Sequence, residues 1–245
     1  IDMFRFWPPI IALLILSCST DAENILAPTL DSAISSKEVV LDNVIACAAS
    51  DIVDSNKISV FFYPRTGVTN IQYYETEDAS VDKNNFDNYR PVEAAISDVF
   101  NGYLKKFDVI TNVEKWVIVS FDEAGQTHLS NPIRLKQNSK PTEYLPENIA
   151  IDATSNMPNF SWQDGSHTDT KIYFQVVSDS GNNLLSGTYT FEKEFQYYSL
   201  NNVVLNITEG TPQALKNEAS YNFTLMGVSE DNWVNLFSEV PFTVE

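Results

Sequence analysis

One aromatic side chain lies among hydrogen-bonding groups in a polar segment near the C-terminus. Trp233 stands within residues 229–235, close to Asp231, Asn232 and Asn235. An aromatic face flanked by carboxylate and amide groups can stack on a sugar ring and hydrogen-bond its hydroxyls. The spacing therefore predicts a ligand-binding site at these four residues. The alternative is structural, with the ring folded back over the end of its own domain or packed on a neighbouring one.

The other reactive groups lack the neighbours that catalysis or metal binding needs. Asp164, His167 and Asp169 share a loop and are spaced so that it could wrap them around a cation. They also suit a solvated turn, and no full calcium-loop pattern is present, so we predict no metal site. Cys47 lies in the apolar run 44–48 with no basic neighbour. A thiol in such surroundings is expected to be buried and structural.

The composition excludes several classes of function. The chain has 245 residues, with 15 Lys and Arg against 33 Asp and Glu, for a formal net charge of −18. A surface this acidic would repel phosphate backbones and anionic lipid headgroups, which excludes nucleic-acid binding and docking through a basic face. The sequence has no nucleophile elbow, phosphate-binding glycine loop, His-Glu-x-x-His or Cys-x-x-Cys motif. We therefore predict that the protein is not an enzyme and needs no cofactor.

The N-terminal segment has the features of a targeting signal. Arg5 precedes the apolar run 10–16, which is too short to span a bilayer but long enough for a signal peptide. Residues 15–18, Ile-Leu-Ser-Cys, resemble the bacterial lipobox, in which the cysteine receives diacylglycerol and becomes the mature N-terminus. The resemblance implies that residues 1–17 are a lipoprotein signal peptide and that the lipid on Cys18 holds the protein at the membrane. An ordinary secretory signal with an incidental cysteine is the alternative.

The polar stretch after this cysteine predicts where the protein is exposed. Residues 18–36 are expected to form a flexible tether behind the lipidated residue. Asp21 and Glu23 resemble the surface-export signal of lipoproteins in Bacteroidota-type bacteria. That resemblance implies an outer-membrane protein facing the cell exterior. The alternative is a polar tether without an export signal.

From residue 37 the chain alternates short apolar runs with turn residues, which predicts β-strands. The clearest is 115–121, ended by an acidic turn and followed by a returning strand at 132–136. Residues 90–100 are expected to form one short helix, because their apolar positions follow helical spacing. The pairs Tyr73–Tyr74 and Tyr197–Tyr198 should each place one ring inward and one outward. Further strands are expected at 39–41, 44–48, 58–63, 69–74, 159–162, 171–177, 187–191, 202–207, 221–228 and 240–244.

The strand pattern occurs twice, on either side of a polar, proline-ended linker at 137–141. Residues 116–135 and 221–243 share an aromatic-led strand, an acidic turn and a proline-marked return. This resembles the last hairpin of a fibronectin type III domain. The resemblance implies an all-β chain with two tandem immunoglobulin/fibronectin III-like β-sandwiches, at residues 37–140 and 141–245.

Charge differs between the two copies. Residues 37–140 carry a net charge of −4 and residues 141–245 a net charge of −11. The second copy should favour neutral glycans, cations or basic protein surfaces, although an acidic surface also suits a salty habitat. The chain resembles the accessory surface lipoproteins of Bacteroidota polysaccharide-utilisation loci. That resemblance implies a non-catalytic protein that binds glycan or substrate for an outer-membrane uptake system, with polysaccharide or transporter proteins as partners. A structural or assembly subunit that contacts other envelope proteins is the alternative.

Overall fold

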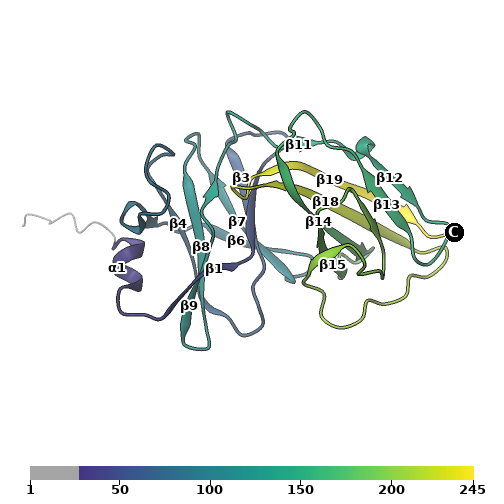
Figure 1. Ribbon diagram of the computed structural model, residues 1–245, viewed down its shortest axis with the longest axis horizontal. Helices are drawn as coiled ribbons and strands as arrows, with labels where there is room; N and C mark the ends of the chain where they lie inside the picture. Colours follow the sequence, from purple (N-terminus) through teal and green to yellow (C-terminus); the bar gives the residue numbers. More distant parts are fainter. Residues whose placement is uncertain (1–27) are drawn as a thin grey trace, which may run out of the picture.

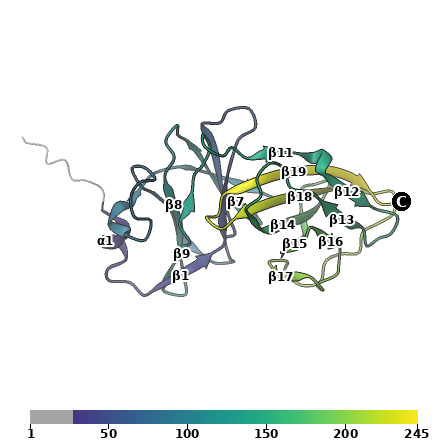
Figure 2. The ribbon, with the colours of Figure 1, turned by 45° about the horizontal axis from the view of Figure 1, so that its top comes forward.

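The computed structural model describes residues 28–245, which form four β-sheets and three short helical segments. The sheets make two units side by side along the longest axis, with helix α1 (Leu30–Ile34) at one end and the C-terminus at the other (Figure 1). The two units remain distinct when the molecule is turned (Figure 2). The protein is all-β and built of β-sandwiches, as the sequence predicts. Cys18 and the signal peptide at 1–17 lie outside the described residues.

The first unit consists of two sheets that enclose an apolar core. One has the order β1 (Val39–Val44), β9 (Gln126–Ser130), β8 (Trp116–Glu123), β4 (Thr69–Glu75) and β5 (Arg90–Pro91), with β10 (Ile133–Arg134) also beside β8. The other has the order β2 (Ala46–Ser50), β3 (Lys57–Phe62), β7 (Leu104–Ile110) and β6 (Ala95–Val99). Alternation along β3 sends Ile58, Val60 and Phe62 into the core, where Val119 and Phe121 of the opposite sheet also lie.

The second unit repeats this plan, with longer strands in its six-stranded sheet. Its six strands have the order β11 (Glu143–Tyr144), β19 (Val234–Thr243), β18 (Ser220–Ser229), β14 (Thr170–Asp179), β15 (Leu184–Thr190) and β17 (Val203–Asn206). Its three-stranded sheet has the order β12 (Ile149–Asp152), β13 (Asn159–Trp162) and β16 (Glu194–Gln196). Phe160 and Phe223 stack across this core with ring centroids 4.1 Å apart. In both units an early strand runs parallel to the last long strand, β1 with β9 and β11 with β19.

The first hairpin turns back earlier than the sequence suggests. Ala124 and Gly125 both have positive φ, 51° and 85°, which allows a two-residue turn that pairs Glu123 directly with Gln126. The returning strand is therefore β9, and the expected strand at 132–136 is reduced to the short β10. His128, which falls between the strands expected at 115–121 and 132–136, consequently lies on β9 and is buried.

The helix expected at residues 90–100 is wrong. The segment contains β5 and β6, and β6 pairs antiparallel with β7 at the edge of the four-stranded sheet. Pro91 has no N–H group for a helical hydrogen bond, and β7 offers the following residues a ladder instead. Val92 and Ile96, expected on the buried face of a helix, are both exposed.

The end of the expected tether belongs to the folded body. Thr29 caps α1 by accepting a hydrogen bond from the Ser32 amide at 3.1 Å, and Leu30 is completely buried beside Tyr74 and Tyr89. Residues 28–36 are therefore not a free spacer. This cover explains why Tyr74 is buried as well as Tyr73, which lies in the core, contrary to the expectation of one outward ring. Tyr197 is buried and Tyr198 exposed, as expected.

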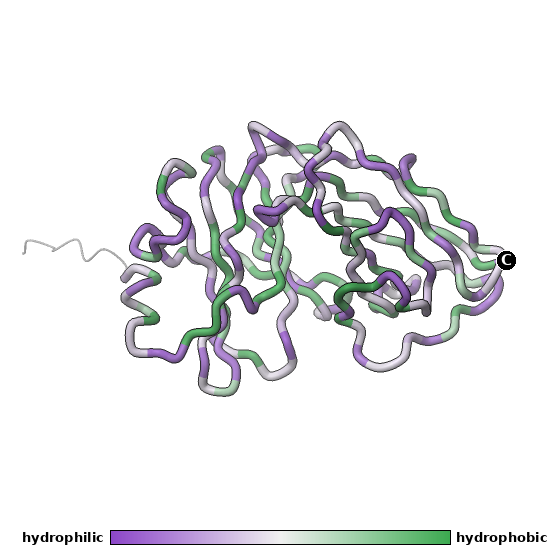
Figure 3. Tube along the Cα trace, in the orientation of Figure 1, coloured by the Kyte–Doolittle hydropathy of each residue, from purple (hydrophilic) through white to green (hydrophobic). Residues whose placement is uncertain are grey.

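Two 3-10 turns complete the fold, η1 (Phe86–Asn88) beside α1 and η2 (Pro146–Asn148) before β12. Apolar residues gather along the strands and where the two units meet, whereas the outer loops are largely polar (Figure 3). Among residues 28–245, no helix combines the length and the apolar character needed to cross a bilayer.

Candidate functional site

The two units meet through two apolar sheet faces. Strand β2 packs Ala46 and Ala48 against the first core, whereas Cys47 and Ala49, together with Ile45 just before the strand, face the other way. On the second unit, the outer face of the six-stranded sheet packs against these side chains. These side chains form one apolar cluster that spans both units, including Phe61, Leu104, Phe174, Val176, Met226, Val228 and Val234. An apolar interface of this kind restrains movement of one domain against the other.

Trp233 is part of this junction. The tip of the β18–β19 hairpin reaches into the first unit, where the indole ring is 0% exposed and packs with Ile133 and Leu135. Its Nε1 donates a hydrogen bond to the Lys140 carbonyl at 2.7 Å, and the amide of Ala48 donates to the Asn232 carbonyl at 3.0 Å. The ring has no free face, so the predicted sugar platform is wrong and the interdomain alternative holds. Burial of a large apolar ring in a core outweighs the polar character of its sequence neighbours.

Polar contacts hold the same junction. Thr142 and Ser50 exchange two hydrogen bonds, from amide to hydroxyl in each direction, at 2.9 and 3.0 Å. The Tyr144 hydroxyl donates to the Ser50 carbonyl at 2.7 Å, and Lys136 pairs with Asp231 across the units at 2.5 Å. Within the polar linker predicted at 137–141, Gln137 is buried and the Lys140 carbonyl accepts from Trp233, whereas Asn138, Ser139 and Pro141 are exposed.

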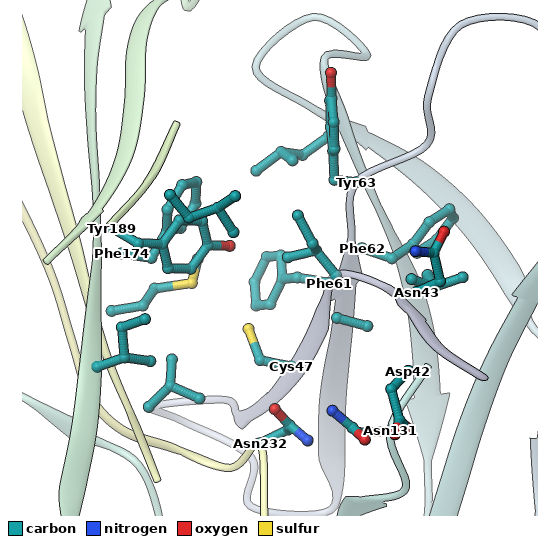
Figure 4. Close-up of a pocket in the computed structure, with 18 of the residues that line it drawn as sticks. Asp42, Asn43, Cys47, Phe61, Phe62, Tyr63, Asn131, Phe174, Tyr189 and Asn232 are labelled. Carbon is teal, nitrogen blue, oxygen red and sulfur yellow. The ribbon is translucent and has the colours of Figure 1, made fainter. Parts of the chain in front are cut away.

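A pocket of about 430 Å³ opens within this junction. In Figure 4 the rings of Phe174 and Tyr189 lie on one side of it and Phe61 faces them from the other, with the Cys47 sulfur pointing into the space between. Phe174 and Tyr189 stack with ring centroids 4.5 Å apart. The remaining apolar and aromatic lining comes from Val44, Ile45, Ala46, Phe62, Tyr63, Leu104, Ile172, Leu205, Met226 and Val228. Its size, apolar walls and position between domains are those of a small-molecule site.

One end of the pocket is polar. Asp42, Asn131 and Asn232 line it, and their labelled side chains lie near one another in Figure 4, whereas Asn43 also lines the pocket but lies apart from these three. Asp42 and Asn232 have positive φ, 55° and 60°, a conformation that Asp and Asn tolerate better than most residues. These side chains can hydrogen-bond a ligand, while the apolar walls hold its body.

The two reactive groups in the pocket are kept neutral. Burial raises the pKa of the Cys47 thiol to about 12. Burial also raises the pKa of the Tyr189 hydroxyl well above its usual value, with a further contribution from Cys47. Neither group would serve as a nucleophile or base at neutral pH. The arrangement suits binding by shape and hydrogen bonds.

The other predicted site residues have structural partners. Asp231 accepts a hydrogen bond from Ser229 at 2.7 Å besides its ion pair, and Asn235 is buried and donates to Asp169 at 2.9 Å. Of the four residues predicted to bind ligand, only Asn232 lines the pocket.

The loop considered for a cation contains carboxylates that pair with lysines. Asp164 lies 2.6 Å from Lys193, and it accepts a hydrogen bond from the Tyr173 hydroxyl at 2.6 Å. Asp169 pairs with Lys140. A ring nitrogen of His167 lies 3.1 Å from the Pro141 carbonyl oxygen. The loop thus contributes to packing against neighbouring segments.

The aromatic and thiol groups of the pocket were not identified from the sequence, although a signal for them was present. The runs 44–48 and 172–177 contain almost no polar residue. A strand that lacks polar alternation is covered on both faces. That pattern indicates a second apolar contact outside each sandwich, and the pocket lies within this contact.

No protein-family model and no curated protein matches the chain. Among solved structures, the chicken interferon gamma receptor alpha chain is 12% identical to this chain, with a TM-score of 0.26. The matched region covers 82% of this chain and 96% of the receptor chain. The FN1–FN3 domains of chicken CNTN1 are 12% identical over 90% of this chain and 69% of their own, with a TM-score of 0.28. A chain of a cytokine receptor complex is 11% identical, with a TM-score of 0.27, and the match covers 82% of this chain and 96% of that chain. These scores are too low to indicate a ligand or partner, and the fold class follows from the strand order of the sheets.

Proposed function

We propose that the protein is a non-catalytic binding protein that holds a small ligand in the pocket between its two sandwiches. The observation that carries the proposal is the 430 Å³ pocket itself, walled by aromatic and aliphatic side chains and polar at one end. Both sandwiches contribute walls and are joined by an apolar interface and hydrogen bonds, so the pocket is already formed without a ligand. A preformed site loses little free energy in ordering itself around a ligand.

The lipid anchor predicted at Cys18 would place this binding function at the outer membrane. The lipobox-like sequence ending at Cys18 supports attachment to the outer membrane, with the ligand collected for an uptake system. The buried Trp233 removes the platform on which a polysaccharide would have stacked. The ligand proposed here is therefore a small molecule enclosed between the units.

Metabolic labelling with palmitate tests the anchor. The chain contains two cysteines, Cys18 and Cys47, which supply a variant and a matched control. We expect label in the native chain and in Cys47→Ala, and none in Cys18→Ala, which should leave the membrane fraction. Recovery of the native chain as an unlabelled protein free of the membrane would contradict the anchor and leave the pocket proposal unaffected.

Titration with the uncharged dye N-phenyl-1-naphthylamine tests the pocket, because its fluorescence rises in apolar surroundings. Leu205 is exposed on β17 and lines the pocket, while its exposed neighbour Val204 does not. Leu205→Trp should weaken dye binding by about tenfold or more, since the larger ring obstructs the pocket. Val204→Trp, the same change one residue away, should bind as the native chain does. Equal binding by both variants, or no binding by the native chain, would refute the proposal.

Exposed apolar side chains favour a second function, in assembly with other envelope proteins. Phe191, Leu200 and Val204 are 65%, 57% and 48% exposed, and Val204 lies on the edge strand β17. Apolar groups on an open sheet edge are typical of protein contacts. If the protein is an assembly subunit, Phe191→Asp should release it from a larger complex in detergent extracts without changing dye affinity. Migration of the native chain as a monomer in such extracts would exclude this function.

A further inference from the structure

The one basic residue that lines the pocket is already neutralised. Arg65 holds Glu123 with two guanidinium nitrogens, at distances from 2.7 to 3.0 Å. It also donates to Asn43, with a hydrogen bond of 2.8 Å to the carbonyl and one of 3.0 Å to the side-chain oxygen, and its Nη2 lies 3.2 Å from Nδ1 of His128. The guanidinium also stacks over Phe121 at 4.9 Å. Committed donors and a matched charge leave this arginine little capacity to bind an anionic ligand.

Asp42 gives the polar end an unmatched negative charge. It is exposed, and within residues 28–245 no lysine, arginine or histidine nitrogen lies within ion-pair distance of its carboxylate. The protein as a whole is also strongly negative, at −18. An anion entering the pocket therefore meets repulsion from the nearest free charge and from the distant field.

Two amides supply uncharged hydrogen-bonding groups beside that carboxylate, and a third lines the pocket apart from it. Across the described residues, the side chains of Asn131 and Asn232 have no hydrogen-bond partner, although both line the pocket. Asn43 uses its side-chain oxygen, which accepts from Arg65 and lies 2.8 Å from a ring nitrogen of His128, and its amide nitrogen has no partner there. Free amide donors and acceptors suit hydroxyl, amide or ammonium groups.

From this charge pattern we infer that the pocket selects amphipathic molecules with an apolar body and an uncharged or cationic head, and rejects their anionic counterparts. The inference rests on the proposed function, because it names the ligand class of the same pocket. The apolar body lies between Phe61 and the stacked Phe174 and Tyr189, and the head lies at Asp42, Asn131 and Asn232. Selection comes from the free carboxylate, and affinity comes mainly from the apolar walls.

Two dyes that share one aromatic body separate the inference from the function on which it rests. N-phenyl-1-naphthylamine is uncharged, and 1-anilinonaphthalene-8-sulfonate adds a sulfonate to the same rings. We expect the native chain to bind the neutral dye with a Kd lower by about tenfold, which is the effect of one nearby charge in a partly solvated site. Raising the salt concentration should narrow this difference, because the carboxylate is exposed.

Asp42→Asn assigns the discrimination to one residue. Asn tolerates the positive φ of this position, so the variant should fold normally. We expect tighter binding of the sulfonate dye by about threefold to tenfold with little change for the neutral dye. Glu93→Gln removes an exposed carboxylate that does not line the pocket, and it should leave both Kd values unchanged.

The outcomes distinguish the two claims. Failure of the native chain to bind the neutral dye refutes the proposed function. Binding of both dyes with equal Kd values, or a ratio that Asp42→Asn does not change, refutes the selection for uncharged and cationic heads while the pocket remains a binding site. A preference for the neutral dye that Asp42→Asn removes and Glu93→Gln retains supports the inference.

Discussion

Replacement of Trp233 is expected to weaken both sandwiches, because this side chain from the second unit fills part of the core of the first. The ring is fully buried, and truncation of such a ring to alanine costs about 3–5 kcal/mol of unfolding free energy. For a protein of this size that loss lowers Tm by about 6–20 °C. Calorimetry should show one unfolding transition for the native chain and two for Trp233→Ala, because the coupling between the units is lost.

A milder pair of variants isolates the hydrogen bond of the indole. Trp162 is equally buried in the second unit, but its Nε1 has no hydrogen-bond partner in the described part of the chain, whereas Nε1 of Trp233 donates to Lys140. Trp233→Phe should therefore cost about 1 kcal/mol more than Trp162→Phe in urea unfolding. Equal costs for the two phenylalanine variants, or a cost below about 1 kcal/mol for Trp233→Ala, would refute this role of the ring.

Three further predictions address other parts of the fold. Leu30→Ala should lower the free energy of unfolding in urea by about 2–5 kcal/mol, since the side chain is fully buried. A negligible loss would show that residues 28–36 belong to the tether and do not stabilise the folded body. Gly187→Ala should cost about 1–3 kcal/mol in the same assay, because a Cβ there would lie 2.9 Å from Ile207, and native stability would show that the strand can shift. The hydrogen bond from Arg65 lowers the pKa of Glu123 in the folded protein. The ionised carboxylate therefore stabilises the fold at pH values above the pKa of the unfolded state, about 4.3. This stabilisation is lost as the pH falls through the lower pKa of the folded state. Urea midpoints measured from pH 7 downward should therefore fall less steeply for Glu123→Gln, and parallel curves would contradict this assignment.

Local patterns in the sequence predicted much of the β-structure. Alternation in 58–63 corresponds to β3, in which every second residue is buried, and the aromatic and apolar run 221–228 corresponds to β18, which is buried on both faces. The same reasoning failed at 90–100, where helical spacing of apolar residues had no buried face to occupy. Edge strands are set by the neighbour they pair with, and a local pattern does not contain that neighbour.

The candidate site was harder to predict than the fold. Trp233 was identified as important, but its polar neighbours suggested an exposed ring, and only the placement of the hairpin tip against the first unit decides its burial. The pocket joins Cys47 and Phe61 to Phe174 and Tyr189, which lie more than 100 residues away along the chain. Packing of one sandwich on another depends on such distant pairs, which no local periodicity specifies.

Protection of Cys47 by a bound ligand is the most direct test of the pocket as a binding site. In a Cys18→Ala chain Cys47 is the only thiol, and its sulfur points into the pocket (Figure 4). Its reaction with methyl methanethiosulfonate should be slow, because burial raises its pKa to about 12. At N-phenyl-1-naphthylamine concentrations tenfold above Kd, we expect the rate to fall by a further factor of about eleven, in proportion to the fraction of empty pockets. An unchanged rate under conditions where the dye is bound and fluorescent would place the dye elsewhere and contradict the account.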